Sequence, residues 1–275
     1  MFFHALRRVA GASTAALILG ATLPLVAAAR DPLSIVPLTM KCRGDSADWR
    51  VDAGVDSALL ARTGGKNAEE LYRGRWTPVP QTGGAAHVWR GVARNKSGAP
   101  LVLFADRGRC EGASDPASEQ RLLASFADGS AAVGCCRATY GYDLRAAAAA
   151  NLKTKVAEDW TRLFVSLQPA IRACVLDRRL GATKVLKAMP MNHGNALVRV
   201  VGQDGATTDC IADLGTARVR ELRPVVWSDP PLPGAGFPTF YPAREQPPVL
   251  ACGKVERVVM PDGVLAGYLQ YGGCD

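Results

Sequence analysis

The chain has 275 residues, a formal net charge of +8 and a hydrophobic content of 48%. This length is enough for one large domain or two ordinary ones. The basic residues form no long block and do not alternate with aromatic residues, so the composition argues against a nucleic-acid partner. A mild positive excess is compatible with anionic polymers of a cell envelope, and equally with an ordinary solvated surface.

The first 29 residues have the pattern of an export signal. The segment MFFHALRR precedes an apolar run from Val9 to Val26, and three alanines then supply a small-residue cleavage pattern. A retained membrane anchor is the alternative, because the run is about long enough to span a bilayer, although Gly, Ser, Thr and Pro within it weaken that interpretation. We therefore expect a signal peptide at 1–29 and a periplasmic or secreted mature chain at 30–275, with no further membrane span.

Residues 30–145 are predicted to form an all-β domain. In HVWRGVAR, Val88, Arg90 and Val92 alternate with Trp89 and Ala93, which is typical of a strand with two different faces. Because no long amphipathic helix interrupts the short strands, the pattern favours an antiparallel barrel or sandwich. Seven short β-like runs, separated by Gly, Pro, Asn and Asp, make up this half: 48–54, 57–64, 75–80, 87–94, 100–108, 121–129 and 130–137.

Five alanines, 146–150, mark the predicted boundary, although they could equally begin the next helix. Residues 151–275 are predicted to form an α+β domain that opens with an amphipathic helix, which Pro169 kinks or divides in two. A helix packed on an antiparallel sheet is the simplest way to bury both apolar faces, and it makes the whole chain α+β. The helical stripe consists of Val156, Trp160, Leu163, Phe164, Leu167, Ile171 and Cys174, and strand-like runs follow at 182–190, 195–202, 207–214 and 217–222.

Residues 229–248 contain seven prolines and several aromatic residues. Proline reduces the entropy that ordering must overcome, so this segment is expected to be a rigid loop packed over the domain. It serves either as a structural lid on a sheet edge or as a binding loop with Phe237, Phe240 and Tyr241 as contact residues. The chain then ends in a predicted hairpin within 255–274.

All eight cysteines lie after the signal, which in an oxidising compartment predicts disulfides. Neighbouring side chains on a strand point to opposite faces, so two adjacent cysteines suit different partners better than each other. Cys110 is expected to bond one member of the adjacent pair and Cys42 the other, while Cys174 pairs with Cys210 and Cys252 with Cys274. The predicted disulfide cysteines are Cys42, Cys110, Cys135, Cys136, Cys174, Cys210, Cys252 and Cys274.

No motif in the mature chain predicts catalysis or a cofactor. The sequence has no G-x-S-x-G elbow, no His-Glu-x-x-His, no Cys-x2-Cys pair and no glycine-rich phosphate loop, so we predict no metal site and no cofactor. The segment MPMNHG places Asn192 and His193 in a tight turn between two strands. They are either turn residues or a binding site, and His193 is the one candidate for a general acid or base.

Four motifs stand out in the N-terminal half: a Cys42-to-Trp49 segment, W-x-G at Trp89–Gly91, C-x-G-x-S-D at Cys110–Asp115 and GCC at Gly134–Cys136. They resemble those of an uncharacterised family of exported bacterial envelope proteins. Such domains are similar to the small barrels beside META-type and c-type lysozyme-inhibitor domains. The resemblance covers 42–137 and implies an inhibitory or envelope-protective role without catalytic residues. The segment GDSADW departs from the G-x-E-P-F-W signature of the family, so no role of that signature carries over.

Three functions follow from these patterns. The first is a non-enzymatic binding or inhibitory protein of the cell envelope, with an envelope protein, a lytic enzyme or peptidoglycan as partner. The second is a periplasmic hydrolase or redox enzyme that uses His193 or a free cysteine. The third is a structural component whose two domains bridge partners. Export, predicted disulfides and the lack of catalytic motifs favour the first.

Overall fold

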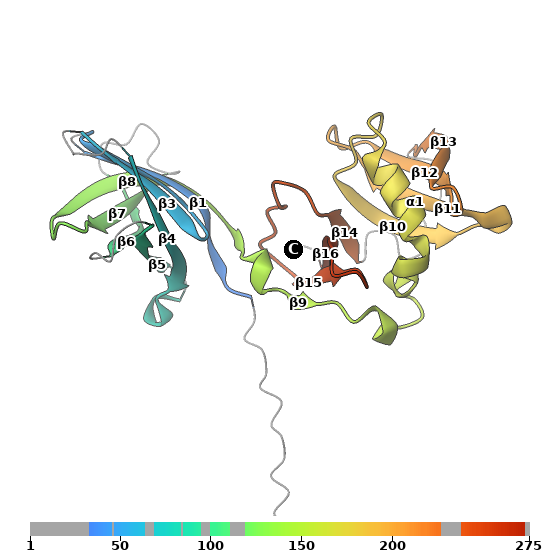
Figure 1. The fold of residues 1–275 in the computed structure, drawn as a ribbon, viewed down its shortest axis with the longest axis horizontal. Coiled ribbons are helices and arrows are strands. Elements are labelled where there is room, and N and C mark those ends of the chain that lie inside the picture. The colour runs from blue at the N-terminus through green and yellow to red at the C-terminus, as the bar shows by residue number, and fades with distance from the viewer. Residues whose placement is uncertain are drawn as a thin grey trace, which may run out of the picture. The chain divides into compact units, whose positions relative to one another are not determined.

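The computed structural model describes residues 33–45, 47–63, 69–83, 85–94, 100–110, 119–226 and 238–272. The predicted signal peptide at 1–29, Phe237 and Cys274 lie outside these residues. The described chain forms a closed eight-stranded barrel followed by a second eight-stranded sheet that carries one α-helix (Figure 1). Within this part of the chain, no helix is both long and apolar enough to cross a membrane.

The barrel is antiparallel and closes by pairing its first strand with its last, which selects the barrel over the sandwich. The structure has one strand more than the sequence predicted, because Ile35–Gly44 was missed as a strand. Cys42 lies on this additional strand, whereas Trp49 begins the next one. The strands are β1 (Ile35–Gly44), β2 (Trp49–Gly54), β3 (Ser57–Arg62), β4 (Glu69–Pro78), β5 (Ala86–Ala93), β6 (Leu101–Arg109), β7 (Glu119–Ser125) and β8 (Ala131–Tyr142).

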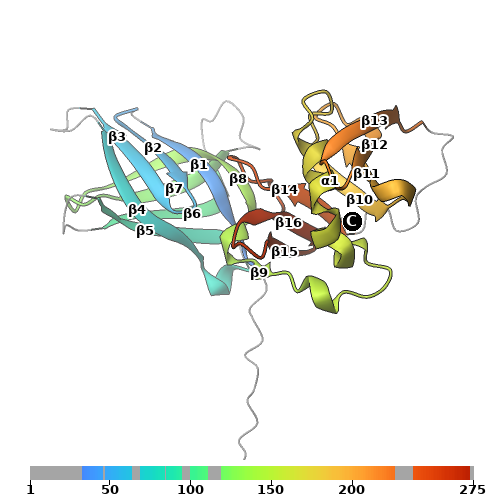
Figure 2. The same cartoon turned by 45° about the vertical axis from the view of Figure 1, so that its right-hand side comes forward.

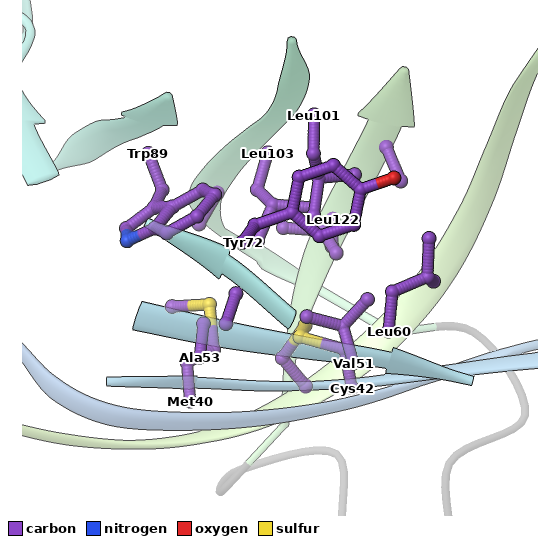
Figure 3. Close-up of a cluster of buried hydrophobic side chains, with 14 of the residues drawn as sticks. Met40, Cys42, Val51, Ala53, Leu60, Tyr72, Trp89, Leu101, Leu103 and Leu122 are labelled. Atoms are coloured by element: carbon purple, nitrogen blue, oxygen red, sulfur yellow. A yellow bond between two sulfur atoms is a disulfide. The ribbon is translucent and has the colours of Figure 1, made fainter. Parts of the chain in front are cut away.

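Inward-facing side chains fill the barrel (Figure 3). The alternation predicted for HVWRGVAR is confirmed, since Trp89 is fully buried while Arg90 and Val92 are exposed. An eight-stranded barrel can either be filled by its own side chains or hold one small ligand. Here buried hydrophobic side chains from all eight strands pack together inside it, so the interior is core. The largest fully buried members of this core are Met40, Val51, Tyr72, Trp89, Leu101, Leu103 and Leu122.

Two of the sequence motifs place a glycine beside a tryptophan ring in this core. A Cβ atom on Gly91 would lie 2.4 Å from a ring carbon of Trp89, and one on Gly134 would lie 2.7 Å from a ring carbon of Trp49. Real Cβ atoms do not approach other atoms so closely, so each ring occupies the space that a side chain would need. The W-x-G and GCC motifs are therefore explained by packing.

The adjacent cysteines in β8 bond to two different partners, as predicted. Cys136 faces the barrel interior and bonds to Cys42, its cross-strand neighbour on β1, with 4.0 Å between the Cα atoms. Cys135 faces outward and bonds to Cys110, which directly follows β6. The first bond closes the barrel covalently between its terminal strands, and the second ties the end of β6 to its outer wall.

The second sheet has the strand order β13-β12-β11-β10-β14-β16-β15-β9. Its two halves meet through one register pair, Val185 on β10 opposite Phe240 on β14. The sheet is antiparallel as predicted except that β9 runs parallel to β15. The strands are β9 (Ala148–Ala149), β10 (Lys184–Pro190), β11 (Asn195–Val201), β12 (Thr207–Asp213), β13 (Arg218–Pro224), β14 (Thr239–Pro242), β15 (Lys254–Val259) and β16 (Leu265–Tyr271).

Helix α1 (Phe164–Leu176) contributes Phe164, Leu167, Ile171 and Cys174 to a core shared with β10, β11 and β12 (Figure 1). The helix begins later than predicted, after a 3-10 turn at Trp160–Leu163, so Val156 is two-thirds exposed rather than part of the stripe. Pro169 lies inside one continuous helix and does not start a second. The predicted bond from Cys174 to Cys210 fixes the helix to β12.

Two further predictions of local structure are corrected. The polyalanine segment does not begin a helix; Ala148 and Ala149 form β9 beside β15. Part of the proline-rich segment is not a loop, because Thr239–Pro242 forms β14 between β10 and β16. The predicted final hairpin is present as β15 and β16. Cys252 is disulfide-bonded, while its predicted partner lies outside the described residues.

Candidate binding groove

A groove opens in the second sheet because one helix cannot cover eight strands. A helix with its side chains is about 10 Å wide, whereas eight strands spaced about 4.8 Å apart span about 34 Å. The main contacts of α1 are with β10, β11, β12 and β13. The adjoining strands β14 and β16 are left uncovered on the same face, and a groove of about 760 Å³ lies there.

The groove has two walls and an aromatic floor. Its helical wall consists of α1 residues spaced three and four apart, which places them on one face of the helix. The floor contains Phe164 and Phe240, whose rings pack edge to face with centroids 4.8 Å apart. The helical wall includes Gln168, Ile171, Arg172, Val175 and Leu176, and the opposite wall, at the β15–β16 turn, includes Met260, Pro261, Asp262, Val264 and Leu265.

Two aliphatic residues at the rim are exposed. Leu176 is 65% exposed and Val264 is 60% exposed, and they stand on opposite walls. The exposed part of an aliphatic side chain gains no hydrophobic stabilisation within the fold, but it buries apolar surface when a ligand covers it. The rim therefore widens the apolar surface of the groove beyond its floor.

Few polar groups line the groove. Arg172 is exposed and, in the described part of the chain, is paired with no carboxylate. Asp262 on the opposite wall uses one carboxylate oxygen to accept a hydrogen bond from the backbone N–H of Val264, 3.0 Å away. An apolar cavity of this volume with a small number of polar groups is the usual form of a small-molecule site. Arg172 is the group best placed to bind an anion.

Phe240 and Tyr241, both predicted contact residues, fall on opposite faces of the sheet because they are neighbours on β14. Phe240 is buried and forms part of the groove floor. Tyr241 joins a separate cluster with Leu144 and Tyr268, and its hydroxyl donates a hydrogen bond to Gln270 at 3.0 Å. Burial raises the pKa of the Tyr241 hydroxyl above its usual value, so it stays neutral at physiological pH.

Asn192 and His193 do not belong to the groove. They form the exposed tip of the β10–β11 hairpin, where His193 takes a positive φ of 60° and Gly194 one of 71°. Among the described residues, no hydrogen-bond partner faces the His193 ring. The structure thus supports the turn interpretation of MPMNHG and brings no carboxylate or nucleophile to this histidine.

The residues that the structure describes contain no free cysteine, which leaves no thiol for the redox version of the enzyme hypothesis in this part of the chain. They also contain no group of three or more His, Cys, Asp or Glu side chains placed to hold a metal ion.

Sequence reasoning missed most of the groove. Arg172 comes one position after the buried Ile171, and Leu176 comes two positions after the buried Cys174. Both lie on the same helical face as the floor residue Phe164, because the three residues are spaced by multiples of four. The pairing of that face with the β15–β16 turn is a tertiary contact that no local pattern reports. The chain matches no family model, and neither the curated proteins nor the solved structures with which it was compared gave a match.

Proposed function

We propose that the chain is an exported, non-enzymatic binding protein of the cell envelope, and that the groove between α1 and the β15–β16 turn holds its ligand. The observation that carries this proposal is the apolar groove itself, with an aromatic floor and two exposed aliphatic residues at its rim. Apolar surface gathered in a concave groove, unlike single exposed side chains, is typical of a ligand site.

The disulfides support export. Three bonds join described cysteines, and each closes a loop of at least 25 residues. Bonds of this kind persist in the periplasm and outside the cell and are rare in the reducing cytosol. They fit the export pattern at residues 1–29.

The groove chemistry favours an amphiphile with one anionic group. Phe164, Phe240 and Leu176 offer apolar contact, and Arg172 offers a cation at the edge. A guanidinium binds carboxylate or phosphate oxygens through paired N–H groups. Peptidoglycan is strongly polar and suits this surface less well than an apolar ligand or an apolar segment of an envelope protein or lytic enzyme.

The test measures binding of dodecanoate to the purified mature chain by isothermal titration calorimetry, with dodecyltrimethylammonium as the cationic counterpart. We expect dodecanoate to bind with a negative heat-capacity change, because apolar surface is buried. Leu176→Ser combined with Val264→Ser should weaken binding about tenfold or more. The matched control is Val165→Ser, at a half-exposed position of the same helix that does not line the groove.

Arg172→Gln should weaken dodecanoate binding, whereas Arg178→Gln, on a nearby exposed arginine outside the groove, should not. Asp262→Asn should leave the affinity unchanged or raise it, because it removes a like charge while preserving the turn. Equal binding of the two detergents by the unmodified chain would contradict the anionic preference. Absence of binding to either would contradict the groove as a ligand site.

A further inference from the structure

A ribbon of four arginines lies on the outer wall of the barrel, on the paired strands β4 and β5. Arg73, Arg75, Arg90 and Arg94 are all exposed. Arg75 lies directly opposite Arg90 in the strand register, and the backbone N–H of Arg94 extends the pairing by donating to Leu71. In the described part of the chain, none of the four has an ion-pair partner.

The opposition of Arg75 and Arg90 is unfavourable for the isolated barrel. Side chains of a directly opposed cross-strand pair stand about 5 Å apart at their Cβ atoms, and like charges in this position destabilise a sheet. The outward positions of β4 and β5 around this pair carry Thr77, Val88 and Val92. The carboxylates of β4 lie at the start of the strand, where Glu69 pairs with Arg50 and Glu70 accepts a hydrogen bond from Tyr72. An external anion between the guanidinium groups would relieve the repulsion between them.

An apolar row runs beside the ribbon. Val88 on β5 is opposite Phe104 on β6, Phe104 is opposite Leu123 on β7, and Leu123 is opposite Val133 on β8. Leu123 is 47% exposed and Val133 is 43% exposed. The wall thus offers cations and aliphatic groups side by side, over the neighbouring strands β4 to β8 of the barrel (Figure 2).

The shape of this wall limits what can bind to it. The outside of a closed barrel is convex. The groove is lined by α1 and the β15–β16 turn, and a smaller cavity is lined by residues of 47–50 and 61–63, so neither lies on this wall. A rigid protein partner would need a matching concave face. A lipid surface is fluid, so its anionic headgroups can move to the spacing of the arginines while its outer acyl region meets the aliphatic row.

We propose that this wall of the barrel, the arginine ribbon together with the apolar row, docks on an anionic lipid membrane surface. The phosphate groups of the lipids lie between Arg75 and Arg90 and beside Arg73 and Arg94. Val88, Leu123 and Val133 contact the outer acyl region. The contact is peripheral and reversible, and it is independent of the groove in the second sheet.

The test is co-sedimentation of the purified mature chain with vesicles of phosphatidylglycerol mixed with phosphatidylcholine, against vesicles of phosphatidylcholine alone. We expect binding to the anionic vesicles only, with an affinity that falls as salt rises. Each basic residue near an anionic membrane contributes about fivefold to affinity, so Arg75→Gln with Arg90→Gln should lower it about thirtyfold. The control, Arg162→Gln with Arg178→Gln, removes the same charge from exposed positions outside the barrel and should change it little.

Leu123→Ser should also weaken vesicle binding, by a smaller factor, while leaving the barrel folded, because this side chain is already half exposed. Two results would overturn the proposal. One is equal loss of binding in the ribbon and control variants, which would mean that only net charge matters. The other is ribbon-dependent binding to soluble polyglutamate without binding to anionic vesicles, which would assign the wall to an acidic polypeptide. Because the groove variants leave the wall intact, they should bind vesicles normally.

Discussion

The two sheets of this chain bury their apolar faces in different ways. The barrel closes on itself, so every strand is paired on both sides and the interior is filled by the side chains of its own wall. The second sheet stays open and relies on one helix to cover it. The packed side chains fill the interior of this barrel, whereas partial coverage of the second sheet leaves a groove beside the helix.

Because of this difference, the features that stabilise the fold and the proposed ligand groove lie in different parts of the molecule. In the barrel, tryptophan rings lie over glycines and a disulfide joins the first strand to the last. In the second sheet, the Cys174–Cys210 bond and a buried ion pair hold the covered half, while the uncovered half carries the groove. The barrel can interact with partners only through its outer wall, and the second sheet can also do so through a cavity.

The largest effect on stability is expected when the disulfide that closes the barrel is removed. The bond between Cys42 and Cys136 spans 94 residues of sequence. Replacing both cysteines with alanine should lower the free energy of unfolding by about 4–5 kcal/mol, because the unfolded chain regains the entropy of a long loop. Hydrogen exchange should increase in β1 and β8 before it increases in β11 and β12. Uniform loss of protection in both sheets would show that they unfold as one unit.

The second prediction concerns the ion pair in the open sheet. Arg199 on β11 donates two hydrogen bonds to Asp209 on β12, at 2.7 and 2.9 Å, and both residues are buried. Asp209→Asn should cost about 3–5 kcal/mol in urea unfolding, because it removes the negative charge that faces a buried guanidinium. The loss of protection should be confined to the second sheet. A cost below about 1 kcal/mol would contradict the role of the pair.

The same pair predicts a pH dependence. Burial opposes ionisation of Asp209, but hydrogen bonds from Arg199 and Arg223 outweigh it and hold the pKa of this carboxyl below its usual value. A carboxyl with a lowered pKa in the folded state stabilises the fold above its unfolded pKa of about 4 and loses this contribution as pH falls further. The stability difference between the unmodified chain and Asp209→Asn, measured by urea unfolding, should therefore shrink below about pH 4. A difference that stays constant into acid would contradict this linkage.

A smaller effect is expected at the glycine beside Trp89. Gly91→Ala should cost about 1–3 kcal/mol, because its Cβ atom would lie 2.4 Å from the Trp89 ring and 2.6 Å from the carbonyl oxygen of Arg73. Gly54→Ala on β2 is the control, since its nearest neighbour would be at an ordinary 3.6 Å. Thermal unfolding followed by tryptophan fluorescence compares the two. Equal melting temperatures would show that the ring moves aside without cost.

The smallest effect has the opposite sign. Arg90→Thr should raise the stability of the barrel by about 0.5 kcal/mol, because it removes the like charge opposite Arg75 and places a β-branched residue on a strand. The same variant should bind anionic vesicles more weakly. A variant that is less stable than the unmodified chain would show that Arg90 has a structural partner.

Much of the fold could be predicted because it is local. The alternation around Trp89, the turns at Asp128–Gly129 and near Gly205, and the strands β10 to β13 all follow from short patterns of apolar residues and turn formers. The different partners of Cys135 and Cys136 followed from the alternation of side chains along a strand.

What could not be predicted depends on contacts between distant segments. Thr239–Pro242 reads as a proline-rich loop, yet it pairs with β10 on one side and β16 on the other. Two alanines become a strand only because β15 offers a parallel edge. The groove depends on which strands α1 leaves uncovered, and the arginine ribbon depends on the register of β4 and β5. The spacing of residues within a single segment does not indicate which distant segments pair or remain uncovered.

The central claim is that the ligand site lies in the groove beside α1 and outside the filled barrel. Titration of the isotope-labelled mature chain with dodecanoate, followed by amide chemical shifts, tests it most directly. The largest shifts should fall within 164–176, 240–243 and 260–266, with the inward-facing barrel residues Leu103 and Leu122 unaffected. Shifts concentrated on the barrel core would contradict it.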